Sequence, residues 1–331
     1  MDRSKTLFVA LTFAALALYP LVAGPFSIDL VTKTMIYAIF ALSLELLVGG
    51  TGLVCFGQAA FFGIGAYALV LLSGASGVPS LVWLLPCCVL AAAAYALFVG
   101  ALSLRTRGVY FIMVTLAFAQ MAYYVAHDTP LGGGTDGIYL TVVPTLSGVD
   151  LSRSPAIYGF TLLCLAAVFG CLALLLRSRF GRALAGIRIN EQRMRAAGFS
   201  TYGYKLAAFV ISGALAGLAG ALFALKDGVV NPELMGWHLS GAVLIMVILG
   251  GIGHLRGALI GAFAFALLQE LFRSEAIFGA FAKHWHLGLG LAIIASVALL
   301  PRGIVGVPAQ IRERLLGFKA TPLTGISDAV A

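Results

Sequence analysis

The chain has 331 residues, of which 61% are hydrophobic and only 10% are charged, and its mean hydropathy is +1.03. This composition excludes a soluble globular protein and leaves no room for a separate enzyme domain. The formal net charge of +8 needs no nucleic-acid partner, because membrane topology and anionic lipid are enough to account for it.

The apolar stretches predict an all-α polytopic membrane protein with about ten transmembrane helices. Several stretches are shorter than the roughly 20 residues that a perpendicular helix needs, so we expect some helices to be broken or half-length. The first stretch resembles a signal peptide but lacks a convincing small-residue cleavage site, and we expect it to be a retained helix. In chain order the expected spans are Leu7–Ala23, Leu30–Val48, Leu53–Ser73, Leu81–Leu104, Val109–Ala126, Ala156–Leu176, Leu206–Leu225, Leu239–Gly250, Gly257–Phe272 and Leu287–Leu300.

The basic residues predict the orientation of these spans. If the chain starts in the cytoplasm and crosses ten times, 16 of the 21 Lys and Arg residues fall inside. Because cytoplasmic loops carry an excess of Lys and Arg, this split favours cytoplasmic N- and C-termini. Residues 1–304 would form the transmembrane domain, and residues 305–331 a basic and then disordered cytoplasmic tail.

Three polar side chains in the first half are candidates for the wall of a transport pathway. Gln58 interrupts a glycine-rich apolar segment, and a polar side chain in hydrocarbon should face a partner helix or the pathway. Thr115 and Gln120 offer further neutral hydrogen-bonding groups without fixed charge. The glycines of this segment are more typical of close helix packing than of a substrate site.

The outer loop, residues 127–154, contains a glycine-rich motif formed by Gly133, Gly134, Thr135, Asp136 and Gly137. With Gly132 it satisfies G-x-G-x-x-G, but no strand precedes it, so we expect no dinucleotide site. The sequence also lacks a Gly-Lys-Ser/Thr phosphate loop, and any ATP hydrolysis must be supplied by another chain.

The loop of residues 177–205 is the most distinctive segment, with seven Lys or Arg residues and one acid. Apolar residues recur at helical spacing while the arginines point elsewhere, which predicts one short amphipathic helix closed by Gly198. The four apolar positions are Leu184, Ile187, Met194 and Ala197. Such a helix would be a docking surface on the cytoplasmic side, and a merely solvated positive-inside loop is the alternative.

Other patterns are weaker. The five cysteines lie in apolar spans and predict neither disulfides nor a metal site, and His284 with His286 lacks further ligands. Glu45 and Glu270 in apolar runs leave a proton-coupled secondary transporter as an alternative. A rhomboid-type protease would need contact between Ser76 and His254, which the topology separates by roughly 30 Å.

The motifs as a set resemble the membrane permeases of bacterial branched-chain amino-acid ABC importers. The matching segments are Gly57–Tyr67, Leu104–Phe111, Thr115–Gln120, Gly133–Gly137, Gly181–Gly198, Lys205–Ser212, Leu249–Gly253 and Pro301–Ile304, and they cover most of residues 42–304 in family order. Cys55, Gln58, Arg193 and Met194 depart from the family pattern.

The resemblance implies a subunit of the bacterial inner membrane that exposes a transport pathway alternately to its two sides. It implies no cofactor, no metal and no catalytic residue in this chain. In this family the loop at residues 177–205 seats a coupling helix on a cytoplasmic ATPase, through the positions Arg182, Ile187, Asn190, Glu191, Ala196 and Gly198. The implied partners are two ABC ATPase subunits, a homologous permease subunit forming a heterodimer, and a periplasmic binding protein that meets the outer loop. The expected substrates are branched-chain or related amino acids, and because close relatives also move urea and short amides, a permease for these compounds is the alternative.

Overall fold

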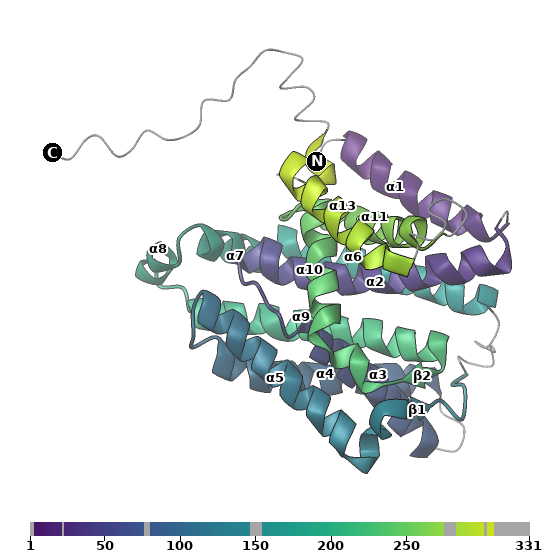
Figure 1. Cartoon of the computed structure of the whole chain (residues 1–331). Coiled ribbons are helices and arrows are strands. Elements are labelled where there is room, and N and C mark those ends of the chain that lie inside the picture. The colour runs from purple at the N-terminus through teal and green to yellow at the C-terminus, as the bar shows by residue number, and fades with distance from the viewer. Residues whose placement is uncertain are drawn as a thin grey trace.

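The computed structural model describes residues 3–21, 23–75, 80–145, 154–274, 283–300 and 303–307. The described part is a helical bundle with one two-stranded sheet (Figure 1). The α-helices are α1 (Arg3–Leu18), α2 (Pro25–Thr51), α3 (Gln58–Ala75), α4 (Leu81–Ser103), α5 (Val109–Asp128), α6 (Ser154–Arg177), α7 (Arg179–Ile189), α8 (Glu191–Ala196), α9 (Thr201–Asp227), α10 (Trp237–Gly250), α11 (Leu255–Arg273) and α13 (Trp285–Leu299).

Short elements connect these helices. They are the 3-10 turns η1 (Tyr19–Leu21), η2 (Pro130–Gly132), η3 (Gly134–Asp136), η4 (Pro232–Met235) and η6 (Ile304–Gly306), and the strands β1 (Ile138–Tyr139) and β2 (Val229–Val230). The two strands pair antiparallel, with Ile138 opposite Val230.

Each expected membrane span coincides with a helix. Within the described residues, seven helical stretches are long and apolar enough to cross a membrane, and three shorter apolar helices lie at residues 11–21, 58–74 and 237–250. The prediction of an all-α polytopic membrane protein is therefore confirmed. Ser76 and most of the predicted tail, residues 308–331, lie outside the described residues.

The third span begins later than predicted, at Gln58 instead of Leu53. Gly52 ends α2 with a φ of +75°, a left-handed conformation that favours glycine, and residues 53–57 then run without helical structure. Hydropathy did not reveal this break because these residues are as apolar as the helix that follows. Non-helical backbone at membrane depth is tolerated only where protein covers it, and Cys55 is indeed fully buried.

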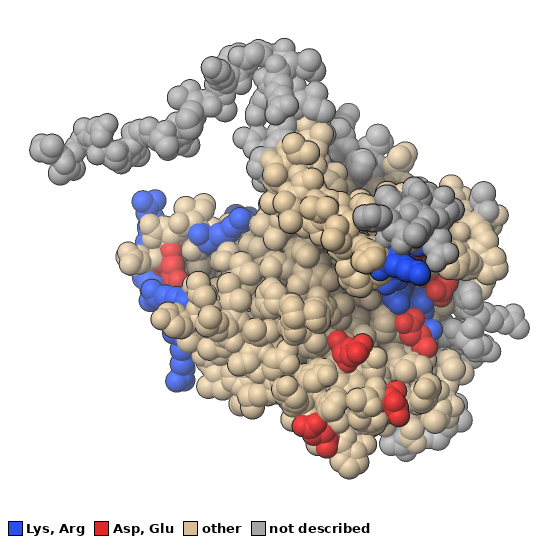
Figure 2. Space-filling model, viewed as in Figure 1, with Lys and Arg blue, Asp and Glu red and all other residues tan. Residues whose placement is uncertain are grey.

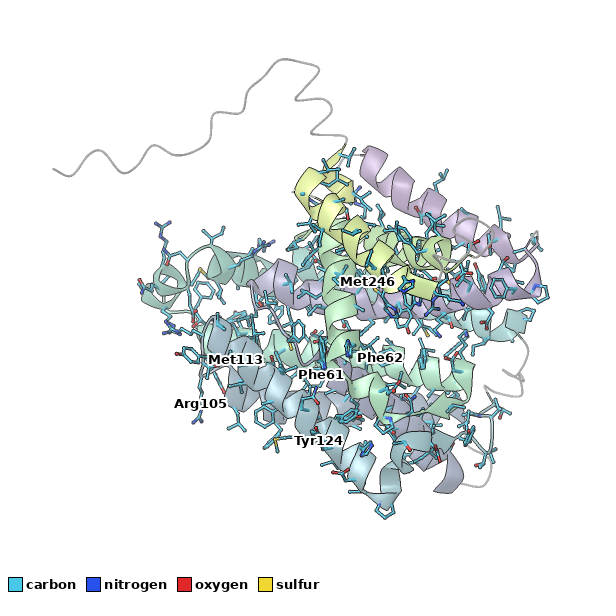
Figure 3. All side chains as sticks on the ribbon, in the orientation of Figure 1. Phe61, Phe62, Arg105, Met113, Tyr124 and Met246 are labelled. Atoms are coloured by element: carbon cyan, nitrogen blue, oxygen red, sulfur yellow. The ribbon has the colours of Figure 1, made fainter. Side chains whose placement is uncertain are left out.

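Helices α2 and α9 form the centre of the bundle. In their most apolar windows, 83% of α2 and 61% of α9 are buried, whereas no more than 33% of any other long span is buried. Small residues let α3 approach α9 closely, because Gly65 faces the backbone of Gly217 and Gly220 faces the carbonyl of Phe62. Beside these contacts, Phe61 packs edge-on against Phe209 with ring centroids 5.5 Å apart (Figure 3).

The bundle has one basic end, where the α7–α8 segment and the α4–α5 and α10–α11 loops gather. The Tyr202 hydroxyl at the start of α9 donates a hydrogen bond to Ala101 O at the end of α4, over 2.9 Å. Gly303, after α13, lies against the backbone of Gly251 between α10 and α11. Figure 2 shows Lys and Arg side chains gathered at this end, whereas most visible acidic side chains lie elsewhere.

Candidate functional site

The basic segment after α6 forms two helices, α7 and α8, instead of the single amphipathic helix predicted. Asn190 separates them because its backbone is extended, with φ −156° and ψ 101°. Its side-chain Oδ1 accepts a hydrogen bond from Arg193 N over 2.9 Å and so caps the second helix. Gly198 follows α8 with a φ of +86°, and its predicted role as a helix stop is confirmed.

The two helices divide their residues between the bundle and solvent. On α7, Ile187 is only 3% exposed and, with Leu184, packs against the bundle. Arg182 lies on the exposed side and donates a hydrogen bond to Arg177 O. Ile189, which the sequence analysis did not single out, is 84% exposed. Ala196 and Gly198 are exposed, and so is Ala197, contrary to its place in the predicted apolar stripe.

Glu191 holds α8 against the first turn of α9. Its Oε2 lies 2.5 Å from Lys205 Nζ, and its Oε1 lies 2.5 Å from Arg195 Nη2. The Thr201 hydroxyl donates to the same carboxylate over 3.2 Å. Partial burial raises the pKa of Glu191, but hydrogen bonds and charge from Lys205, with hydrogen bonds from Arg195 and Thr201, outweigh it and hold the pKa below its ordinary value. Glu191 therefore positions the segment and is not free for a partner.

A junction joins α7 to the helices behind it. Arg188 donates a hydrogen bond to Gly49 O near the end of α2. In the same region Glu45, which is 3% exposed, accepts a hydrogen bond from Gly253 N in the α10–α11 loop over 2.7 Å. A displacement of α7 would thus act directly on α2 and, through α2, on the α10–α11 loop.

The three candidate pathway residues lie in two different places. Gln58 and Thr115 belong to a buried polar cluster, which also contains Ser43, Ser212 and Ser240. Gln58 Nε2 donates to Ser43 Oγ over 3.0 Å and to Ser212 Oγ over 2.9 Å. Thr115 Oγ1 accepts a hydrogen bond from Phe56 N over 3.3 Å. In this conformation the cluster joins α2, α3, α5, α9 and α10, and both side chains are covered by protein.

Gln120, by contrast, lines a cavity of about 840 Å³ on one side of the bundle. This cavity, here called the vestibule, is open to the surface and is lined by residues of α2, α5, α10, α11, α13 and η4. Tyr124 of α5 and Met246 of α10 come from two of its walls and are labelled in Figure 3. Cavities that bind small molecules measure roughly 300–1,000 Å³, so the vestibule has the size of a ligand site.

Substitutions of the two glutamines should separate stability from transport. Replacing Gln58 by Leu removes the hydrogen bonds that its Nε2 donates to two buried hydroxyls. We expect the free energy of unfolding to fall by about 1–3 kcal/mol. Replacing Gln120 by Leu should leave the melting temperature of the detergent-purified protein unchanged and lower the rate of uptake. A Gln58→Leu protein that melts like the wild type but transports nothing would assign Gln58 to the pathway instead.

The glycine-rich loop lies at the end of the bundle opposite the basic end. Gly133, Gly134 and Gly137 have φ values of +72°, +63° and +74°, which glycine adopts without strain. A Cβ at Gly137 would collide with Val230 O, so this glycine also lets β1 approach β2. Thr135 and Asp136 are exposed between these turns.

An ion-pair cluster and a second cavity lie near this loop. Lys226 Nζ lies 3.0 Å from Asp29 Oδ1 and 2.9 Å from Asp227 Oδ1. Lys33 Nζ adds a contact with Asp227 Oδ2 at 3.6 Å. Asp29, Lys226 and Asp227 border a cavity of about 620 Å³, which shares Glu233 and Leu239 with the vestibule.

The other patterns noted in the sequence can be located in the structure. Within the described ranges, no three His, Cys, Asp or Glu side chains are grouped to hold a metal ion. Two helical turns and the strand β1 surround the G-x-G-x-x-G motif, and no βαβ unit contains it. Glu45 is engaged with the α10–α11 loop, as described above, and Glu270 lies on α11.

Comparisons with known proteins give a consistent result. A profile of the family described as branched-chain amino acid transport system / permease component matches residues 26–298. The high-affinity branched-chain amino acid transport system permease protein LivM of Salmonella typhimurium is 33% identical over 328 residues, which cover 92% of this chain and 75% of that protein. LivM of Escherichia coli gives the same identity and coverage.

Shorter matches involve other permeases. The probable branched-chain amino acid transport permease protein LivH of Methanocaldococcus jannaschii is 28% identical over 143 residues, or 42% of this chain and 45% of that protein. No solved structure matches the chain significantly.

Proposed function

The chain belongs to the permease components of branched-chain amino acid transport systems, and we propose that it is a transmembrane subunit of an ABC importer that moves leucine, isoleucine, valine or related amino acids. The match to LivM over 92% of the chain carries this proposal. A cavity of ligand size and a separate basic segment, the α7–α8 segment, also support it.

The basic end would face the cytoplasm of a bacterium, and the inner membrane would hold the ten helices of residues 1–304. Both termini would be cytoplasmic, because ten spans return the chain to the side on which it starts and 16 of the 21 Lys and Arg residues then lie on that side. Residues 177–205 would then lie inside and residues 127–154 in the periplasm. Gly133–Gly137, with exposed Thr135 and Asp136, would meet the periplasmic binding protein.

The α7–α8 segment would dock on one of two ATPase subunits. Exposed Ile189 offers an apolar contact, and exposed Arg182 of α7 and Arg193 of α8 add positive charge to the same segment. Buried Ile187 would seat the segment on the permease itself. Closure of the ATPase pair would move α7, and the contacts of Arg188 and Glu45 would pass that motion to α2 and α10, two walls of the vestibule.

A second, homologous permease subunit would complete the pathway. Similarity to proteins named LivM and to one named LivH fits a pair of related but different chains. The pathway would open and close between the two, in the alternating manner of importers.

Deletion of the gene in its own host tests the function. We expect the strain to lose high-affinity uptake of radiolabelled leucine, isoleucine or valine, and plasmid-borne wild-type chain to restore it. Loss of urea or acetamide uptake, with all three amino acids spared, would leave an ABC permease and overturn the substrate class. Uptake that persists in vesicles without ATPase subunits, driven by a proton gradient, would instead support a secondary transporter.

A further inference from the structure

The vestibule has one acidic side chain that no residue of the structure neutralises. Glu233 lies on η4, where the vestibule meets the second cavity, and its side chain is exposed. Among the described residues, no Lys, Arg or His pairs with its carboxylate. The nearby acids differ in this respect, because Lys226 bridges Asp29 and Asp227. Glu233 is therefore available to bind a cationic group of a ligand.

The opposite charge lies behind another wall of the same cavity. Trp285 of α13 lines the vestibule, and the Arg273 guanidinium lies 4.1 Å from the centroid of its ring. Arg273 itself does not line the cavity, so among the described residues the charged group that the vestibule presents directly is the Glu233 carboxylate. An ammonium group of a ligand would gain from this carboxylate, whereas a neutral amide would gain little from it.

The remaining walls suit an apolar side chain near an ammonium group. Leu239, Met246 and Phe265 offer apolar surface, and Met246 and Phe265 are buried. The rings of Trp237 and Tyr124 lie on the same cavity and can face a cation. Gln120 and Gln269 supply amide donors for a carboxylate.

We propose that the vestibule is the site at which this subunit holds a zwitterionic amino acid in transit, with Glu233 binding the ammonium group. The apolar side chain lies against Leu239, Met246 and Phe265, and the carboxylate is turned toward Gln120 and Gln269. The inference rests on the transport function proposed above and adds the residues that distinguish amino acids from neutral amides.

The test uses the complete importer, with binding protein and ATP, and measures initial uptake of radiolabelled leucine. Glu233→Gln keeps the shape of the side chain and removes its charge, so we expect uptake to fall by at least about tenfold, the loss of one charged hydrogen bond. Glu233→Asp should recover part of the rate. Glu270→Gln is the matched control, because it makes the same change next to Gln269 without lining the vestibule, and it should transport normally.

A second measurement reports binding independently of rate. Ala242→Cys places a thiol on the vestibule wall in a background in which the five native cysteines are replaced. We expect leucine to slow its modification by a methanethiosulfonate reagent, and acetamide to have no such effect. If the Glu233→Gln subunit does not assemble into the importer, this protection measurement still tests whether leucine binds in the vestibule.

The outcomes separate the two proposals. Suppose that the wild-type complex imports leucine. The vestibule site is then overturned if Glu233→Gln keeps half the wild-type rate or better, or if leucine does not protect an active Ala242→Cys protein from modification. Either result leaves the proposed transport function intact. A wild-type complex that imports no branched-chain amino acid overturns the proposed function and the vestibule site together.

Discussion

Replacing Glu191 by Lys is expected to nearly abolish ATP-driven uptake while the protein still reaches the membrane in normal amounts. The new ammonium group would lie among Arg195 and Lys205, which now bind the carboxylate at 2.5 Å each. Like charges at this distance repel, so α8 would leave the first turn of α9. We expect uptake to fall at least about tenfold. A fall of that size corresponds to a loss of only about 1.4 kcal/mol in the interaction free energy between the segment and its partner.

The experiment compares this variant with Gln192→Lys, which adds a cation at the neighbouring exposed position without touching the network. Uptake of radiolabelled leucine and copurification of the ATPase subunits are measured for both. We expect Gln192→Lys to behave like the wild type. Full uptake by Glu191→Lys, or equal damage from both substitutions, would mean that the segment acts only through its net charge.

A leucine at Gly220 is expected to prevent stable folding. Gly220 of α9 faces the carbonyl of Phe62 in α3, so an added side chain meets main-chain atoms that cannot move without separating the two helices. Overpacking of a filled interior typically costs 1–3 kcal/mol and can cost more, and here a backbone contact leaves little room for repacking. We expect little folded protein and a much lower melting temperature in detergent.

The matched control is Gly170→Leu in α6. An added Cβ at Gly170 meets no atom within 4 Å, so the same substitution should be tolerated. Melting followed by size-exclusion chromatography compares both variants with the wild type. Equal stability of the Gly220 and Gly170 variants would show that the close approach of α3 and α9 is dispensable.

Hydropathy and charge were sufficient to predict the helical spans, because both report on burial in hydrocarbon one residue at a time. Every expected span contains a helix, and Gly198 ends α8 as its position implied. The extended run at residues 53–57 was not predicted, because an extended apolar segment and an apolar helix have the same composition. Its backbone is supported by Thr115, which lies far away in sequence.

The division of the basic segment into α7 and α8 also depended on a detail that periodicity does not reveal. Asn190 was selected only by resemblance, yet its extended backbone and side-chain cap separate α7 from α8. The exposure of Ile189 follows from this break, because it lies at the last position of α7. Gln58 and Gln120 are both polar residues in apolar runs, and only the packing around each reveals that one is enclosed while the other lines a cavity.

The vestibule could not be predicted because its walls come from segments that are distant in the chain. Tyr37, Gln120, Glu233 and Trp285 lie on four separate elements. Glu233 follows a proline in a short turn and resembles an ordinary loop acid in the sequence. Among the described residues its carboxylate lacks a basic partner because Lys226 pairs with two other carboxylates, and only the folded structure reveals this pairing.

The buried start of α3 has a consequence for the order in which the protein can be assembled during synthesis. Ala59 N donates its hydrogen bond to Ser240 Oγ, 181 residues further along the chain, and Gln58 binds Ser212, 154 residues further along. When α3 leaves the ribosome, neither partner has been made, and unpaired polar groups are costly in hydrocarbon. The N-terminal helices must therefore remain loosely associated, with these groups hydrated or temporarily paired elsewhere, until α9 and α10 arrive to complete the bundle.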